Sequence, residues 1–111
     1  MTEADIMRQI QLAATKLGAR LFRNNVGMAT TNTGSVIRFG LAVGSADLIG
    51  WSATGKFIAI EVKRPYGKPT KEQRRFLDAV VAAGGIAGVA RSVEDAVEII
   101  QGGKNEPQNK P

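Results

Sequence analysis

The chain has 111 residues, a length that suits one compact domain and excludes two domains with separate cores. It contains no cysteine and no histidine, which excludes disulfide bonds, thiolate-bound zinc and imidazole catalysis, so any metal ion must be bound by oxygen. A formal net charge of +5 favours a polyanionic partner, although charge alone is weak evidence for one.

The sequence gives no sign of membrane insertion. No apolar run approaches the roughly 20 residues that a membrane-spanning helix needs. The first residues, Met1 to Asp5, lack the basic start of a signal peptide. We therefore expect a cytoplasmic protein that makes no membrane contact.

The first part of the chain predicts a helix, a strand and a polar loop. Thr2 is expected to cap the helix and Gly18 to end it, with a buried face of Ile6, Ile10, Ala13, Ala14 and Leu17. Residues 19–23 favour a short strand. Residues 24–35 are rich in Asn, Thr and Gly, which predicts a loop or a loosely formed ribbon suited to contact with a partner. A brief strand is expected at residues 36–39.

The middle of the chain predicts a hairpin followed by a helix. Two antiparallel strands are expected at residues 47–52 and 56–63, joined by a turn at residues 53–55. Thr70 then opens a helix that Gly84 closes. The apolar stripe of this helix is expected to carry Phe76, Leu77, Val80 and Val81.

The last part of the chain predicts a buried strand at residues 86–90 and a helix from Ser92 to Ile100. The inward face of that helix is expected to carry Val93, Ala96, Val97 and Ile100. We expect residues 1–103 to form one domain and the polar residues 104–111 to form a disordered tail. The order of elements predicts the α/β class, with a mixed sheet flanked by helices and a right-handed parallel crossover after the hairpin.

The second hairpin strand carries an unusual pair of charges. Alternation places Ile58, Ile60 and Val62 on one face, and Glu61 and Lys63 together on the other. Charged residues are depleted from strand interiors and costly to bury unless paired or bound to metal. Asp47 adds a carboxylate at the head of the partner strand, so a metal site for phosphodiester cleavage fits. A surface ion pair on an edge strand is the simpler alternative.

Oxygen ligands favour magnesium or manganese, and such an ion between two carboxylates both activates water and neutralises charge on phosphate. Asp47 and Glu61 are expected to bind the ion, with the backbone carbonyl of Val62 as a candidate third ligand. Lys63 has two acids near it, so we expect it to stay protonated and to stabilise charge rather than act as a base.

The residues in and after this hairpin resemble the virus-type replication-repair nuclease (VRR-NUC) family of the PD-(D/E)xK superfamily. The likeness rests on residues 44–50, 57–65 and 67–73 and on Gly84-Gly85. It implies a restriction-endonuclease-like core and a nuclease that depends on Mg²⁺ or Mn²⁺. Ala46 stands where the motif has proline, which weakens local stiffness rather than chemistry because proline supplies no ligand.

The resemblance assigns individual roles. Asp47 matches the motif aspartate, and Glu61 and Lys63 match the ExK pair. Gln73 matches a glutamine on the following helix, but it also fits a capping box opened by Thr70. Glu3 matches a first-helix glutamate that faces the site in many members, but it also suits the positive end of that helix. Both roles stay open for each of these two residues.

The resemblance also implies a homodimer that cuts branched DNA, such as four-way junctions or flaps. Basic residues are expected to hold the DNA phosphates, with a merely solvated basic surface as the alternative: Arg23, Arg38, Arg64, Lys68, Lys71, Arg74 and Arg75. Trp51 is expected in the core and Tyr66 in a turn. A non-catalytic DNA-binding module or an accessory subunit of a larger enzyme would fit the same fold and surface.

Overall fold

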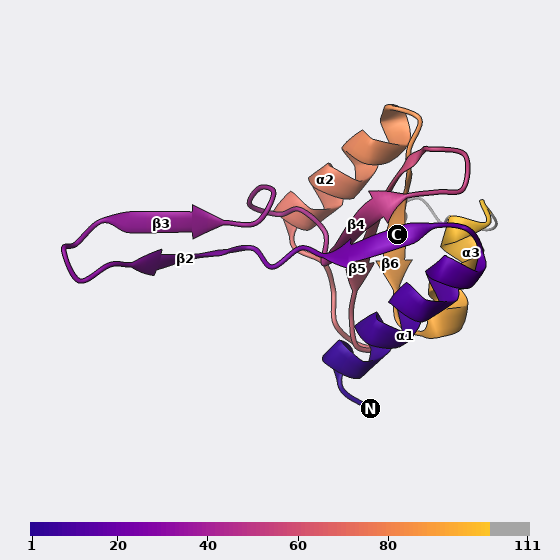
Figure 1. Cartoon of the computed structure of the whole chain (residues 1–111), viewed down its shortest axis with the longest axis horizontal. Coiled ribbons are helices and arrows are strands. Elements are labelled where there is room, and N and C mark those ends of the chain that lie inside the picture. The colour runs from indigo at the N-terminus through magenta and orange to yellow at the C-terminus, as the bar shows by residue number, and fades with distance from the viewer. Residues whose placement is uncertain (103–111) are drawn as a thin grey trace.

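The computed structural model describes residues 1–102, and in it helices cover both faces of a four-stranded sheet (Figure 1). The sheet has the order β1-β4-β5-β6, and its strands are β1 (Arg20–Arg23), β4 (Leu48–Trp51), β5 (Phe57–Val62) and β6 (Ile86–Ala90). The helices are α1 (Glu3–Lys16), α2 (Lys71–Ala82) and α3 (Val93–Ile100). Within the described residues, no helix is both long and apolar enough to cross a membrane.

The strand pairing confirms the predicted mixed α/β sheet. β4 pairs antiparallel with both β1 and β5, whereas β6 pairs parallel with β5. α2 provides the crossover between β5 and β6, as expected for a connection between parallel strands. β5 therefore lies inside the sheet, and the interpretation of its charges as decoration of an edge strand is wrong.

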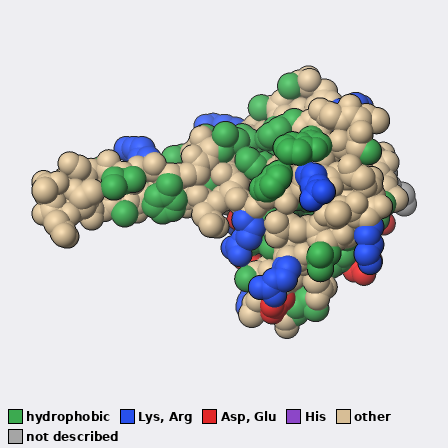
Figure 2. Space-filling view, in the orientation of Figure 1, with side chains coloured by type: hydrophobic (Ala, Val, Ile, Leu, Met, Phe, Trp, Pro, Cys, Tyr) green, Lys and Arg blue, Asp and Glu red, His purple; other side chains and the backbone are tan. Residues whose placement is uncertain are grey.

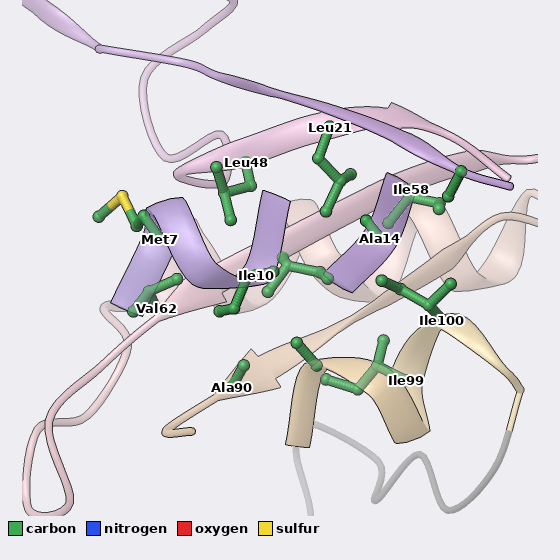
Figure 3. Close-up of a cluster of buried hydrophobic side chains, with 13 residues drawn as sticks. Met7, Ile10, Ala14, Leu21, Leu48, Ile58, Val62, Ala90, Ile99 and Ile100 are labelled. Carbon is green, nitrogen blue, oxygen red and sulfur yellow. The ribbon is translucent and has the colours of Figure 1, made fainter. Parts of the chain in front are cut away.

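Two clusters of buried side chains hold the layers together. The larger lies between the sheet and the pair α1 and α3, and Figure 3 shows Ile10, Ile58, Val62 and Ile99 meeting in it. The smaller lies beneath α2 and consists of Ala46, Ala59, Leu77 and Ala87. Because β5 contributes to both, its alternation decides which side chains face each helix layer.

The helix boundaries follow the local signals. Thr2 and Thr70 each accept a backbone N–H bond from the residue three positions on, and that residue bonds back to the cap, so both form complete capping boxes. Ser92 caps α3 in the simpler way. α1 and α2 are followed by Gly18 and Gly84, whose φ angles of 80° and 94° favour glycine.

Some predictions of burial were wrong. Trp51 is 49% exposed and Val81 is 47% exposed, although both were expected inside. Trp51 is exposed because α2 packs on β5 and β6 and leaves the outer part of the sheet uncovered, whereas Val81 lies on α2 itself, where only Leu77 is buried. Conversely, Met7 and Ile99 are buried in the larger cluster without having been expected there. Tyr66 lies in a turn, as predicted, and is 97% exposed.

A separate antiparallel hairpin projects from the sheet (Figure 1). Its strands are β2 (Gly27–Thr30) and β3 (Val36–Phe39), which pair with each other. Residues 24–35 were expected to be a loop or a loosely formed ribbon, and the ribbon is confirmed. We call residues 26–43 the arm. The predicted tail at residues 104–111, and the domain end at residue 103, lie outside the described residues.

The contrast between the two sides of α1 gives a test of the core. Ile10 is fully buried and Leu12 is 61% exposed. We expect Ile10→Ala to lower the free energy of unfolding by about 2–5 kcal/mol, because it leaves a cavity. Leu12→Ala should change it by less than about 0.5 kcal/mol. Urea unfolding followed by circular dichroism measures both, and equal effects would contradict this packing.

Candidate active site

The register of the central hairpin brings two carboxylates together. Leu48 pairs with Ile60, so extending the antiparallel register by one residue places Asp47 opposite Glu61 on the same face. The Oδ2 atom of Asp47 accepts a hydrogen bond from the Val62 backbone N–H at 2.9 Å. The sheet itself therefore fixes the position of Asp47 relative to the end of β5.

Glu61 lies on the α2 side of the sheet with only 2% of its surface exposed. Its Oε2 accepts a hydrogen bond from Gln73 Nε2 at 3.0 Å and lies 3.6 Å from Lys63 Nζ. Its Oε1 is buried and has no hydrogen-bond partner in the described part of the chain. Burial raises the pKa of Glu61 to about 8, the Asp47 carboxyl adds to the rise, and Lys63 opposes it.

These residues fit a divalent cation. A buried carboxylate oxygen without a partner, beside a second carboxylate, is an arrangement that a cation stabilises. Among residues 1–102 no cluster of three or more Asp, Glu, His or Cys side chains is suited to a metal ion. The chain thus offers two carboxylates, and the remaining ligands would be backbone oxygen, water or phosphate, as is common for magnesium.

The backbone of Val62 and the side chain of Glu3 differ in how they relate to this pair. In an antiparallel pair the N–H and C=O of one strand residue point to the same side. Continued to Val62, this rule directs its carbonyl to the same edge of β5 as its N–H, which donates to Asp47, so the carbonyl stays a candidate ligand. Glu3 lies in the first turn of α1 and forms no three-carboxylate group with Asp47 and Glu61.

Gln73 makes a contact that fits each of the two roles suggested by its position. Its Oε1 accepts a hydrogen bond from Thr70 N at 2.8 Å, which completes the capping box of α2. At the same time its Nε2 donates to Glu61 Oε2. The two interpretations were posed as alternatives, but a side-chain amide has a donor and an acceptor and so can serve both. The cap orients the donor toward the buried carboxylate.

Lys63 directly follows β5, and its backbone is held to the sheet. Its N–H donates to the Ala90 carbonyl at 3.1 Å, continuing the parallel pairing. Its side chain is 21% exposed, so the ammonium group keeps access to solvent while lying beside Glu61. The turn that follows is held by Arg91, whose guanidinium donates to the carbonyls of Pro65 and Gly67. Sequence reasoning missed Arg91, because it lies beyond the matched motif.

Asn24 organises the segment that precedes Asp47. Its Nδ2 donates to Ser45 Oγ at 2.7 Å and to the Ala46 carbonyl at 2.8 Å, and its backbone N–H donates to the Asp47 carbonyl. Its Oδ1 accepts from Leu41 N. This network supplies stiffness that a proline at position 46 would otherwise provide. The sequence offered no signal for it beyond a polar residue at the end of a strand.

A polar cleft of about 370 Å³ opens beside the carboxylate pair, lined by Asn24, Asn25, Val26, Gly44, Ser45, Asp47 and Gln73. Gly44 has a φ of 82°, and an added Cβ there would meet the backbone of Glu72 at 2.9 Å. The loop before Asp47 thus lies tightly against the start of α2. The cleft brings Asp47 and Gln73 to one surface.

The candidate DNA-binding residues are distributed unevenly around this cleft. Arg64 and Lys68 lie between β5 and α2, and the early turns of α2 carry Lys71, Arg74 and Arg75. All five therefore lie in the stretch of chain that comes directly after the end of β5 where Glu61 lies. Arg23 ends β1 beside Asn24, whereas Arg38 lies on β3 in the arm, away from the carboxylates.

Comparison with known proteins identifies the family of the chain. The family model described as VRR-NUC domain matches residues 9–94, which is most of the chain and includes Asp47, Glu61, Lys63 and Gln73. No curated protein matches the chain. The chain therefore belongs to the VRR-NUC family, whose domain is a nuclease of the PD-(D/E)xK type that binds DNA and generally uses divalent metals.

The raised pKa of Glu61 predicts how stability depends on pH. Between pH 4.5 and about 8 the folded protein holds the Glu61 proton while the unfolded chain releases it, so stability falls as pH rises through this window. The slope is at most about 1.4 kcal/mol per pH unit. Thermal unfolding of metal-free protein in a chelating buffer should show this fall, and Glu61→Gln should remove it. An unchanged slope in Glu61→Gln would assign the fall to other groups.

Proposed function

With membership of the VRR-NUC family as the premise, we propose that this chain is an endonuclease that hydrolyses DNA phosphodiester bonds with Mg²⁺ or Mn²⁺. Asp47 and Glu61 hold the ion, with the Val62 carbonyl as a third ligand. The observation that carries the proposal is the buried Glu61 carboxylate, whose Oε1 has no hydrogen-bond partner among residues 1–102 and which lies opposite Asp47. Such a group needs a cation to remain ionised at neutral pH.

The side chains around the carboxylate pair have distinct tasks. A divalent ion held there would activate water and neutralise charge on the phosphate oxygens. Gln73 holds Glu61 Oε2 in place, and the backbone of Val62 does the same for Asp47. Lys63 Nζ lies 3.6 Å from Glu61 Oε2 and is proposed to stabilise the negative charge that develops on the phosphate.

The basic residues are proposed to hold the DNA backbone. Arg64, Lys68 and Lys71 are exposed next to the first turn of α2, where helix N–H groups also favour phosphate. Arg74 and Arg75 extend this surface along α2. Arg23 pairs with Leu48, whose side chain lies in the larger core on the other face of the sheet, so its contact with DNA stays a prediction. Contacts of this kind position DNA without reading bases. Arg38 stays a prediction, because the arm holds it apart from the others.

The preferred substrate is proposed to be branched DNA, cut by a homodimer. The described residues form a nuclease core and one hairpin, without a separate module for reading bases, so selection follows from the shape of the DNA. Two symmetric cuts in a four-way junction require two catalytic centres related by a two-fold axis. A dimer of this chain would supply them.

Substitution of the catalytic set tests the proposal. We expect Asp47→Ala, Glu61→Ala and Lys63→Ala each to lower the cleavage rate by more than about 100-fold, because each removes charge that acts in the transition state. Glu98→Ala and Lys56→Ala, which alter exposed charges elsewhere, are matched controls and should cleave like wild type. Chelator should abolish cleavage by all variants.

The assay uses labelled linear, splayed, flap and four-way-junction DNA in Mg²⁺ and in Mn²⁺. Faster cleavage of the branched substrates than of linear DNA supports the proposed preference, and equal rates would refute it. Undiminished cleavage by Glu61→Ala would refute the assignment of the site. Salt-sensitive, metal-independent binding with no cleavage of any substrate would favour a non-catalytic DNA-binding module instead.

The two roles of Gln73 can be separated by comparing it with its capping partner. Thr70→Ala removes the hydroxyl that accepts from Gln73 N and should cost about 1 kcal/mol of stability while leaving cleavage near the wild-type rate. Gln73→Ala should lose similar stability and also lower the rate by about 10-fold or more, because it releases Glu61. Activity that simply follows stability in both variants would show that Gln73 acts only as a cap.

A further inference from the structure

The arm exposes many large apolar side chains. Six of its large apolar side chains are between 47% and 74% exposed: Met28, Val36, Ile37, Phe39, Leu41 and Val43. The pairing of Gly27 with Phe39 and of Ala29 with Ile37 puts Phe39 and Ile37 on one side of the ribbon. An isolated hairpin of this length is only marginally stable, so packing against an apolar surface would stabilise the arm.

A second apolar surface lies on the sheet itself. α2 packs mainly on β5 and β6, so part of the same sheet face stays exposed. We call its three exposed aromatic residues the open face: Phe22, Trp51 and Phe57, each between 40% and 51% exposed. Phe22 and Trp51 contact each other with ring centroids 5.5 Å apart. Clusters of exposed aromatic residues mark protein interfaces.

The arm and the open face are exposed on the same side of the molecule. Figure 2 shows hydrophobic side chains gathered over β1, β4 and α2, and again along the arm, on one face. Consider a second copy related by a two-fold axis that runs parallel to this face and just outside it. The rotation makes the two faces oppose each other, so that the open face of the second copy lies against the arm of the first. The same rotation brings the second arm onto the first open face, as a closed symmetric dimer requires.

We propose that two copies of this chain dimerise by reciprocal arm exchange, in which the arm of each packs on the open face of the other. The charge of the arm favours protein over DNA as its partner. Residues 24–46 contain one charged residue, Arg38, in a chain with 15 basic and 10 acidic residues. An arm that gripped DNA would be expected to carry several basic side chains, whereas a nearly neutral one avoids repulsion between two copies of charge +5.

Each copy contributes two apolar surfaces to this exchange, its arm and its open face. A half-exposed aromatic ring leaves about 100 Å² uncovered. The open face carries three such rings, and the arm carries Phe39 and its aliphatic neighbours. Because the dimer is symmetric, each of these surfaces is buried twice, once in each of the two arm-to-face contacts. A stable interface buries about 800 Å² on each partner. Arm exchange rests on the proposed function only because both assume a homodimer. The experiments that test arm exchange use neither DNA nor metal.

The first experiment is sedimentation of the purified full chain at several concentrations. Wild type should be dimeric, and Ile37→Glu on the arm and Trp51→Lys on the open face should each weaken the dimer by about 30-fold or more. An equimolar mixture of the two variants should form dimers again, because one arm and one open face remain wild type and the other contact pairs glutamate with lysine. Leu12→Glu, on the exposed side of α1, should leave the dimer intact.

A second experiment exploits the absence of cysteine from the chain. Under mild oxidation a mixture of Ile37→Cys and Trp51→Cys should form a disulfide between the two variants, while neither variant alone should cross-link. Disulfides in Ile37→Cys alone would show arm-to-arm pairing, and those in Trp51→Cys alone would show face-to-face pairing. The proposal is overturned by either of these two results, by a monomeric wild type, or by a mixture of the two cysteine variants that fails to cross-link. A monomer that still cleaves DNA would overturn only the dimer, and an inactive dimer would overturn only the nuclease.

Discussion

The buried carboxylate of Glu61 is the constraint around which the rest of the site is arranged. A charge inside a sheet is stable only when its neighbours compensate for lost water. Gln73 donates to one oxygen, Lys63 lies beside the same oxygen, and the other oxygen remains without a partner in the described chain. The neighbouring Asp47 carboxyl raises the pKa of Glu61 and so opposes the ionisation of Glu61. The carboxylate pair is therefore costly to ionise without a further cation, an arrangement that is common at functional sites.

The fold supports this arrangement through short-range links. β5 is the central strand, so its alternation sends Ile58, Ile60 and Val62 into the larger core and Glu61 toward α2. The N-terminal turn of α2 reaches Glu61 through the same glutamine that caps the helix. Helix stability and carboxylate position are thus coupled in one side chain. A residue that serves both needs is hard to replace, because glutamate would add a third negative charge and alanine would satisfy neither.

Much of the fold followed from local patterns, and part of the site did as well. Helix periodicity and the caps at Thr2, Thr70 and Ser92 identified the three helices, since these signals act within four residues. The pairing of Asp47 with Glu61 followed from a hairpin register. Burial at Trp51 could not be inferred locally, because it depends on how far α2 extends over the sheet. The role of Asn24 was equally hidden, since its partners lie about 20 residues away.

The arm leaves the sheet at Asn24 and returns at Ser45, and hydrogen bonds between these two ends close the loop directly beside Asp47. Gly44 then presses this closure against the first turn of α2. The base of the arm therefore lies directly beside a candidate metal ligand. Because Asn24 is hydrogen-bonded to both Ala46 and Asp47, any displacement of the base of the arm would also move the backbone that carries this carboxylate.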